Sequence, residues 1–232
     1  LGLVGSEMCI RDSLMADENG ENADELIGAA LCNAEDDIIL VSKLGMSLKF
    51  QANDEQLRPM GRQTAGVQGM KFREGDELLA MDVVWGDSDK DLFVVTNEGF
   101  AKRTAISEYR LQGRNGLGIK AVQLVEGRGS LVGALVVSED DQVMAIMKSG
   151  KVIRSNVDEV KRTGRNTQGV TFAKPDKGDE ILSIARNEEK DDPEEEVADN
   201  GTAEAGQSPA EPVNESNETA QSGENVNNVD EA

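Results

Sequence analysis

Residues 92–124 read LFVVTNEGFAKRTAISEYRLQGRNGLGIKAVQL, and they decide the fold because the chain repeats their pattern once before and once after. An apolar run leads into Gly99, a basic residue follows at Arg103, and a second turn at Gly113 and Gly118 precedes another apolar run. The outer copies begin with IILVSKLGMSLKF at residues 38–50 and VMAIMKSGKVIRS at residues 143–155. We therefore interpret the chain as one structural unit used three times.

The glycines of the turns keep a nearly constant spacing. Gly45, Gly99 and Gly150 lie 54 and 51 residues apart, and an arginine follows the second glycine of each copy. A third glycine in each copy precedes the apolar runs LLAMDVV, LVGALVV and ILSIARN. A period near 50 residues, built from short β-type runs and glycine turns, is typical of bladed β architectures. An irregular β-sandwich with evenly spaced turns is the alternative.

The predicted fold class is all-β, with propeller-like β-pinwheel blades and almost no helix. The partial disc would hold three full repeats and part of a fourth, because ADELIGAALCN at residues 23–33 matches GDELLAMDVV at residues 75–84. We assign residues 14–187 to this domain. Residues 1–13, LGLVGSEMCIRDS, fit no blade and lack a secretory signal, so we interpret them as a sequencing artefact, with a genuine linker as the alternative.

Charge is unevenly distributed along the chain, whose net charge is −21. It is −7 for residues 1–35, zero for residues 36–187 and −14 for residues 188–232. The last segment has no aromatic residue and few apolar ones, so we predict a disordered acidic tail. Its carboxylates are expected to fold back transiently as a phosphate mimic that competes with an anionic ligand, and a purely solubilising extension is the alternative.

Basic residues recur at equivalent positions of the neutral body. Equivalent positions of a bladed fold occupy equivalent places in space, so recurring cations predict a basic stripe that contacts the phosphates of DNA. Cations that only solubilise a β surface are the alternative. Further cations beside the turns are Lys71, Arg110, Lys120, Lys161, Arg162 and Lys174. The candidate DNA-binding residues are Lys49, Arg62, Lys102, Arg103, Arg114, Arg154 and Arg165.

Residues for other chemistry are sparse. The chain has no histidine, and its single tyrosine, Tyr109, is interpreted as a packing residue rather than a nucleophile. Cys9 and Cys32 are not expected to pair, which fits a reduced cytoplasmic setting. Two carboxylate groups have the pattern of solvated turns, with a metal site as the alternative: Asp87, Asp89 and Asp91, and Glu139, Asp140 and Asp141.

The run TNEGFAKRTAISEYRLQGRNGLGIKAVQL closely resembles the repeat of the C-terminal domain of DNA gyrase A, part of a type IIA topoisomerase. The motifs that carry the resemblance are the TNxGxxKR turn, the pair Glu108 and Tyr109, and the GRxGxG turn. The resemblance implies a six-bladed β-pinwheel in which neighbouring blades exchange strands and a basic rim wraps duplex DNA. Wrapping would let ATP-dependent strand passage by the holoenzyme introduce negative supercoils, and the seven candidate cations would contact phosphates.

The resemblance also implies partners and a location. They are double-stranded DNA, the rest of the gyrase A protein and the gyrase B protein in an A2B2 heterotetramer, in the cytoplasm at the nucleoid and away from any membrane. ATP and Mg²⁺ would be used elsewhere in the holoenzyme, with no cofactor and no catalytic residue in this fragment. The diagnostic Q-R-G-G-K/R-G box is absent, and QGRNGLG at residues 112–118 is a degenerate echo. The alternatives are the equivalent domain of the topoisomerase IV A protein and a protein-binding β-propeller scaffold.

Overall fold

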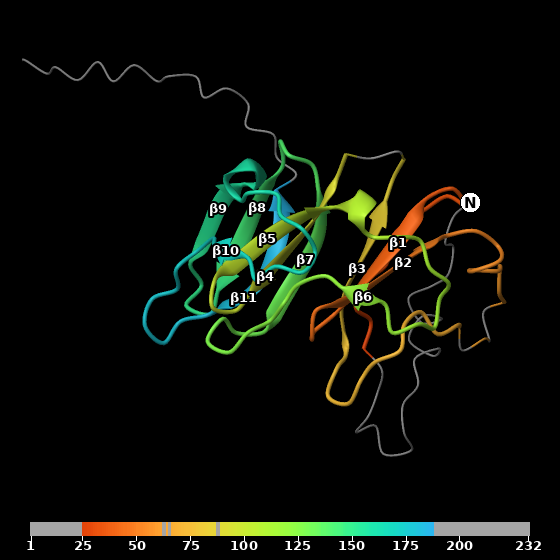
Figure 1. The fold of residues 1–232 in the computed structure, drawn as a ribbon, viewed down its shortest axis with the longest axis horizontal. Coiled ribbons are helices and arrows are strands. Elements are labelled where there is room, and N and C mark those ends of the chain that lie inside the picture. The colour runs from red at the N-terminus through yellow and green to blue at the C-terminus, as the bar shows by residue number, and fades with distance from the viewer. Residues whose placement is uncertain (1–24, 62–63, 65, 87–88, 188–232) are drawn as a thin grey trace, which may run out of the picture. The chain divides into compact units, whose positions relative to one another are not determined.

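The computed structural model describes residues 25–187 except 62–63, 65 and 87–88 (Figure 1). The predicted all-β class is confirmed, since the described helices are two 3-10 turns, η1 (Ile106–Glu108) and η2 (Val157–Glu159). Residues 1–13 and the acidic tail lie outside the described residues. The strands are β1 (Asp37–Ser42), β2 (Met46–Gln51), β3 (Leu78–Val84), β4 (Asp91–Thr96), β5 (Phe100–Ala105), β6 (Ile119–Lys120), β7 (Leu131–Val137), β8 (Gln142–Met147), β9 (Val152–Asn156), β10 (Val170–Thr171) and β11 (Ile181–Asn187).

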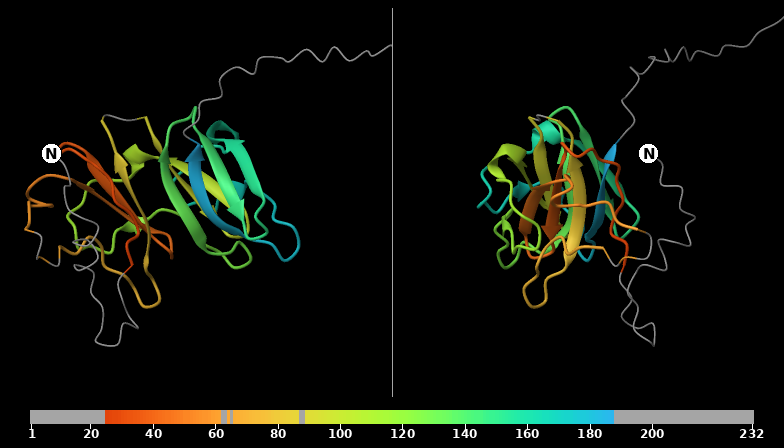
Figure 2. Two further views of the ribbon diagram at one scale, coloured as in Figure 1. Left: turned by 180° about the vertical axis from the view of Figure 1, so that it is seen from behind. Right: turned by 90° about the vertical axis from the view of Figure 1, so that its right-hand side faces the viewer.

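Each repeat folds into one antiparallel blade, as the spacing predicts. A hairpin supplies two strands, and the third apolar run of the repeat pairs with the first strand of that hairpin. The orders are β3-β1-β2 in blade 1, β7-β4-β5 in blade 2 and β11-β8-β9 in blade 3. Strand β7 of blade 2 contacts both β3 of blade 1 and β11 of blade 3, and it lies between them in Figure 2.

Neighbouring blades exchange a short strand, as the resemblance implies. Strand β6, from the second repeat, pairs with β2 of blade 1, and we call this pairing the first joint. Strand β10, from the third repeat, pairs with β5 of blade 2 and forms the second joint. Gly118 and Gly169 precede these strands at φ of 71° and 82°. A Cβ at either position would collide with the backbone oxygen of the partner strand, at Ser47 and at Ala101 respectively.

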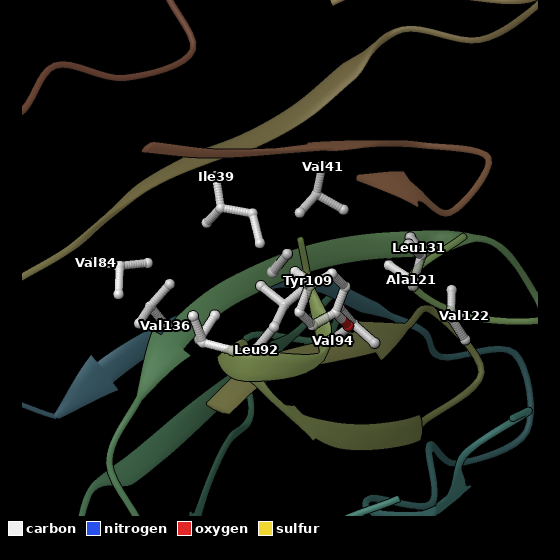
Figure 3. Packing of buried hydrophobic residues seen from close by; sticks show 12 residues of the cluster. Ile39, Val41, Val84, Leu92, Val94, Tyr109, Ala121, Val122, Leu131 and Val136 are labelled. Carbon is white, nitrogen blue, oxygen red and sulfur yellow. The ribbon is translucent and has the colours of Figure 1, made fainter. Parts of the chain in front are cut away.

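The core lies between the blades, and strand alternation explains it. Successive side chains of a strand point to opposite faces of the sheet. A strand of a blade that lies between two other blades is therefore apolar on both faces. Leu92 and Val94 of β4 pack toward blade 1 with Ile39, Tyr109 and other residues of one cluster (Figure 3). Phe93 and Val95 pack toward blade 3 in a second cluster. The run DLFVVT is therefore buried along its whole length.

The predicted strand within residues 23–33 is not formed. The described part of this segment, residues 25–33, contains no strand, and its Leu26, Ile27 and Leu31 side chains are exposed. Third strands of this fold pair with the first strand of a hairpin, and both edges of β1 already carry β2 and β3. Three blades are thus formed by the described chain, and the sequence match at residues 23–33 does not produce a further strand.

Candidate nucleic-acid interface

The basic turn of the second repeat, at residues 113–118, lies on blade 1 beside the first joint. The backbone amide of Asn115 donates to the Gly69 oxygen at 2.7 Å, and the amide of Lys71 donates to the Gly116 oxygen at 2.8 Å. The Arg114 guanidinium donates to the Gln68 oxygen at 2.8 Å. This second turn is therefore held by the preceding blade, not by its own.

The turn of the third repeat, at residues 164–169, lies on blade 2 in the same way. The amide of Thr163 donates to the Arg103 oxygen at 2.9 Å, and the amide of Arg165 donates to Glu108 Oε2 at 3.2 Å. The Arg128 guanidinium, stacked 4.6 Å from the Phe100 ring centroid, donates to the Gly169 oxygen at 2.9 Å. The two joints thus place arginine-bearing turns at equivalent positions of successive blades.

Lys102 is buried, which corrects its assignment to a surface stripe. The residue is only 1% exposed. The ammonium donates to the carbonyl oxygens of Ala121 at 2.8 Å, Gly164 at 2.8 Å and Arg165 at 2.5 Å. Burial lowers its pKa to about 8, against the opposing effect of Glu108. All three ammonium protons are used within the protein, so none remains for a phosphate.

Arg103 is buried as well, at 5% exposure, which also corrects its assignment to the predicted surface stripe. Its guanidinium donates to the Val160 oxygen at 2.5 Å, Asp91 Oδ2 at 3.3 Å and Glu139 Oε1 at 2.8 Å. Arg162 from the third repeat also reaches Asp91, at 2.9 Å. Burial raises the pKa of the Asp91 carboxyl, and the two arginines oppose that shift. These residues form an ion-pair network inside the second joint.

The recurrence of the cation after the hairpin turn follows from the fold. Lys49 pairs with Asp37 at 3.3 Å, with 11% of the lysine side chain exposed. Lys49 and Arg103 occupy the same strand position, and each is matched by the aspartate at the start of the preceding strand. A cation that recurs in phase thus neutralises a carboxylate in at least two blades. Recurrence at one phase therefore has a structural cause that is separate from DNA binding.

The other candidate residues lie nearer the surface. Arg154 is exposed on β9, whereas Arg114 and Arg165 are half-buried in their turns. Arg62 lies outside the described residues. Additional cations beside the turns are more exposed than Lys49, Lys102 and Arg103, and they supply the surface charge near the joints. They are Lys71, Arg110, Lys120, Lys161 and Lys174.

The described carboxylates of the two acidic groups serve turns and ion pairs. Asp89 pairs with Arg162 at 3.1 Å, and Asp141 accepts a hydrogen bond from the Ser138 amide at 2.7 Å. Asp87 lies outside the described residues, and the part of the chain that the structure describes holds no group of three potential metal ligands. Tyr109 is 2% exposed within the core, which confirms its packing role.

Within the described chain, no helix has the length and apolar character needed to cross a membrane.

Known proteins are similar to this chain in sequence and in fold. The family described as DNA gyrase C-terminal domain, beta-propeller, matches residues 36–84, 90–138 and 141–188. The DNA gyrase A protein of Streptomyces coelicolor is 56% identical over 174 residues, which cover 75% of this chain and 20% of that protein. The DNA gyrase A protein of Mycolicibacterium smegmatis is 49% identical over 181 residues, covering 78% and 21%. The chain therefore spans about a fifth of the length of these relatives.

Solved structures agree with the sequence comparison. A structure of the DNA gyrase A C-terminal domain superposes with a TM-score of 0.60 at 29% identity, covering 66% of this chain and 50% of that one. The C-terminal domain of DNA topoisomerase IV superposes with a TM-score of 0.61 at 19% identity, covering 66% and 47%, which shows a shared fold. The match of three consecutive blades decides the family: the chain belongs to the DNA gyrase C-terminal domain family of β-propellers.

Proposed function

We propose that this chain binds and wraps duplex DNA as part of a DNA gyrase A protein. The observation that carries the proposal is the repeated joint, where blade 1 and blade 2 each hold an arginine-bearing turn of the next repeat beside exposed lysines and arginines. Spaced cations of this kind bind the phosphate backbone without reading sequence, and they offset the energy of bending a short duplex. Gyrase relatives carry the matched segment as a minor part of a longer chain.

Direct phosphate contact is proposed for the candidate cations that lie nearest the surface. Arg114, Arg154 and Arg165 are the described ones, and Arg62 remains a prediction. Lys49 keeps only a small exposed fraction and pairs with Asp37, so its proposed contribution to phosphate binding is minor. Lys102 and Arg103 stabilise the second joint from inside. The exposed lysines and arginines beside the turns join the proposed surface.

The holoenzyme would supply everything beyond DNA binding. We expect the rest of the gyrase A protein and the gyrase B protein, assembled as an A2B2 heterotetramer in the cytoplasm at the nucleoid, to provide the catalytic groups and to use ATP and Mg²⁺. Wrapping by this domain would then set the sign of the crossing presented for strand passage, so that negative supercoils result. The equivalent domain of the topoisomerase IV A protein is the second candidate, because its fold superposes equally well.

Salt-dependent binding tests the proposal. The full chain is titrated with a duplex of roughly 40 base pairs and arbitrary sequence between low and moderate salt. A backbone-binding surface predicts that log K falls linearly with log salt, with a slope of about −0.9 per phosphate neutralised. Arg154→Gln should reduce the slope by roughly one contact. Affinity that is unchanged by salt, or an absence of binding at low salt, would favour a protein-binding scaffold instead.

Deletion of the acidic tail is a second test of the same DNA-binding surface. Removing residues 188–232 removes a segment with a net charge of −14. If the tail competes with phosphates, its deletion should tighten DNA binding several-fold at low salt, and the gain should shrink as salt rises. A tail in which the acidic residues are replaced by Ser, Asn and Gln is the matched control. Equal affinity of all three chains would show that the tail only solubilises.

A further inference from the structure

One position of the repeat changes chemistry from blade to blade. The third residue after each hairpin glycine is Leu48 in blade 1, Lys102 in blade 2 and Ile153 in blade 3. Leu48 is buried in an apolar cluster, and a Cβ built on Gly116 would lie 3.2 Å from its Cδ1 atom. An aliphatic side chain therefore suits this place in the fold, and the ammonium in blade 2 calls for another explanation.

The Lys102 ammonium donates hydrogen bonds to carbonyl oxygens from two parts of the chain. The Ala121 oxygen belongs to the second repeat, whereas the Gly164 and Arg165 oxygens belong to the turn of the third repeat. These last two carbonyls flank the backbone of Arg165 itself. The Gly164 oxygen also accepts from the Thr167 hydroxyl at 2.9 Å, and the Arg165 amide donates to the Glu108 carboxylate. The start of the turn and its arginine backbone are thus tied to blade 2.

The direction of these carbonyls matters for an anion. A carbonyl oxygen carries partial negative charge and repels a phosphate, while a backbone amide attracts one. Binding to Lys102 directs the Gly164 and Arg165 oxygens into the protein. Because both oxygens are engaged by the ammonium, two negative dipoles are kept away from a phosphate that approaches the turn. No aliphatic residue at this position would fix those oxygens.

We propose that Lys102 is a positioning residue for DNA binding: it anchors the turn at residues 164–169 from inside the joint and so orients Arg165 toward the phosphate backbone. The inference rests on the proposed DNA-binding function. It assigns the buried lysine a role through Arg165, and it predicts that Lys102 itself makes no contact with DNA.

The protonation of Lys102 should make DNA affinity depend on pH, and charged groups surround its ammonium. Glu108 of η1 and Arg165 of the turn face the ammonium, and both also act on the pKa of the neighbouring Tyr109 phenol. Burial is the main cause that lowers the pKa of Lys102 to about 8. Deprotonation leaves two donor protons for three carbonyls, and it removes a positive charge beside Arg165. DNA affinity should therefore decline as pH rises through about 8 in the unchanged chain.

The test is Lys102→Leu in the full chain, because leucine is the residue at the equivalent place in blade 1. The variant is compared with Arg165→Gln and with the double variant, and Leu48→Met serves as the control at the first joint. Binding to the same duplex is measured by fluorescence anisotropy over a range of salt, at about pH 7 and about pH 9, on either side of the lysine pKa. Amide hydrogen exchange of residues 163–169 is followed in the absence of DNA.

The expected result is a loss of affinity of about tenfold at low salt for Lys102→Leu, with a slope reduced by about 0.9, the value of one phosphate contact. The turn amides should exchange faster, and the double variant should bind no more weakly than Arg165→Gln. The decline in affinity with rising pH should vanish. Leu48→Met should match the unchanged chain.

Two results would overturn the inference. Additive losses in the double variant would show that Lys102 acts independently of Arg165. Unchanged affinity, slope and turn exchange in Lys102→Leu would show that the ammonium positions nothing. A failure of the unchanged chain to bind the duplex at low salt is distinguishable from both, and it would overturn the proposed function together with this inference.

Discussion

The two joints share a backbone and differ in their side chains. Both seat a two-residue strand on the second strand of a hairpin, and both place a glycine against the partner backbone. The first joint is closed by Leu48 and a single pair between Lys49 and Asp37. The second is closed by the Lys102 ammonium and an ion-pair network around Asp91. Backbone geometry thus defines the joint, and either apolar or ionic side chains can fill it.

The largest difference is expected when the acid of each joint is removed. Asp91→Ala leaves the buried Arg103 without its aspartate and should cost about 3–5 kcal/mol of unfolding free energy. Asp37→Ala removes the partner of a lysine that keeps more contact with water, and it should cost about 1 kcal/mol. Urea denaturation followed by circular dichroism measures both. Equal losses would contradict the view that the second joint alone depends on a buried ionic network.

The glycines of the joints should respond alike. Gly118→Ala and Gly169→Ala each force a Cβ into the partner backbone at a positive φ, so each should cost roughly 2 kcal/mol or more. Gly127→Ala is the matched control, because Gly127 has φ of 82° with no neighbour within 4 Å of a Cβ. It should lose only about 1 kcal/mol from conformational strain. A loss at one joint alone would separate their backbone requirements.

The smallest predicted effect is a pH dependence of the unfolding free energy that arises from Lys102 in the second joint. The folded pKa of Lys102, about 8, lies below its ordinary value of 10.5, so the unfolded chain binds more protons between those values. Unfolding free energy should therefore rise with pH above about 8 in the unchanged chain, relative to Lys102→Leu. After allowance for solvent screening, the rise is on the order of 1 kcal/mol at about pH 9.5.

This pH comparison stops below about 10, because burial raises the pKa of Tyr109 and unfolded tyrosine ionises near 10. The measurement is a series of urea denaturation curves for the two proteins across this pH range. Parallel pH profiles for the two proteins would contradict the assignment of the titration to Lys102.

The sequence predicted the blades well because their signals are local. Hairpin glycines, short apolar runs and the spacing of the third run lie within one repeat, and the structure confirms all of them. The burial of Arg103 was missed, although a signal existed. An aspartate stands 12 positions before the cation in two repeats, at Asp37 before Lys49 and at Asp91 before Arg103. That pairing predicts an internal ion pair as readily as a surface stripe.

The burial of Lys102 and its carbonyl partners could not be predicted from the sequence. Two of its carbonyl partners lie 62 and 63 residues away, and backbone carbonyls leave no mark in the residue types. The predicted strand at residues 23–33 failed for a related reason. Its residues resemble those of β3, but a third strand pairs with the first strand of a hairpin, and β1, β4 and β8 are each already paired on both sides. Which strand sides are open is a property of the assembled sheet.

The central claim is that this surface wraps DNA, and the topology of closed circles tests it most directly. Nicked circular DNA is incubated with increasing amounts of the full chain at low salt, sealed with ligase, stripped of protein and resolved by electrophoresis. We predict a progressive shift in linking number that weakens with salt and is reduced by Arg165→Gln. An unchanged distribution of linking numbers under conditions where the chain is bound to DNA would contradict the claim.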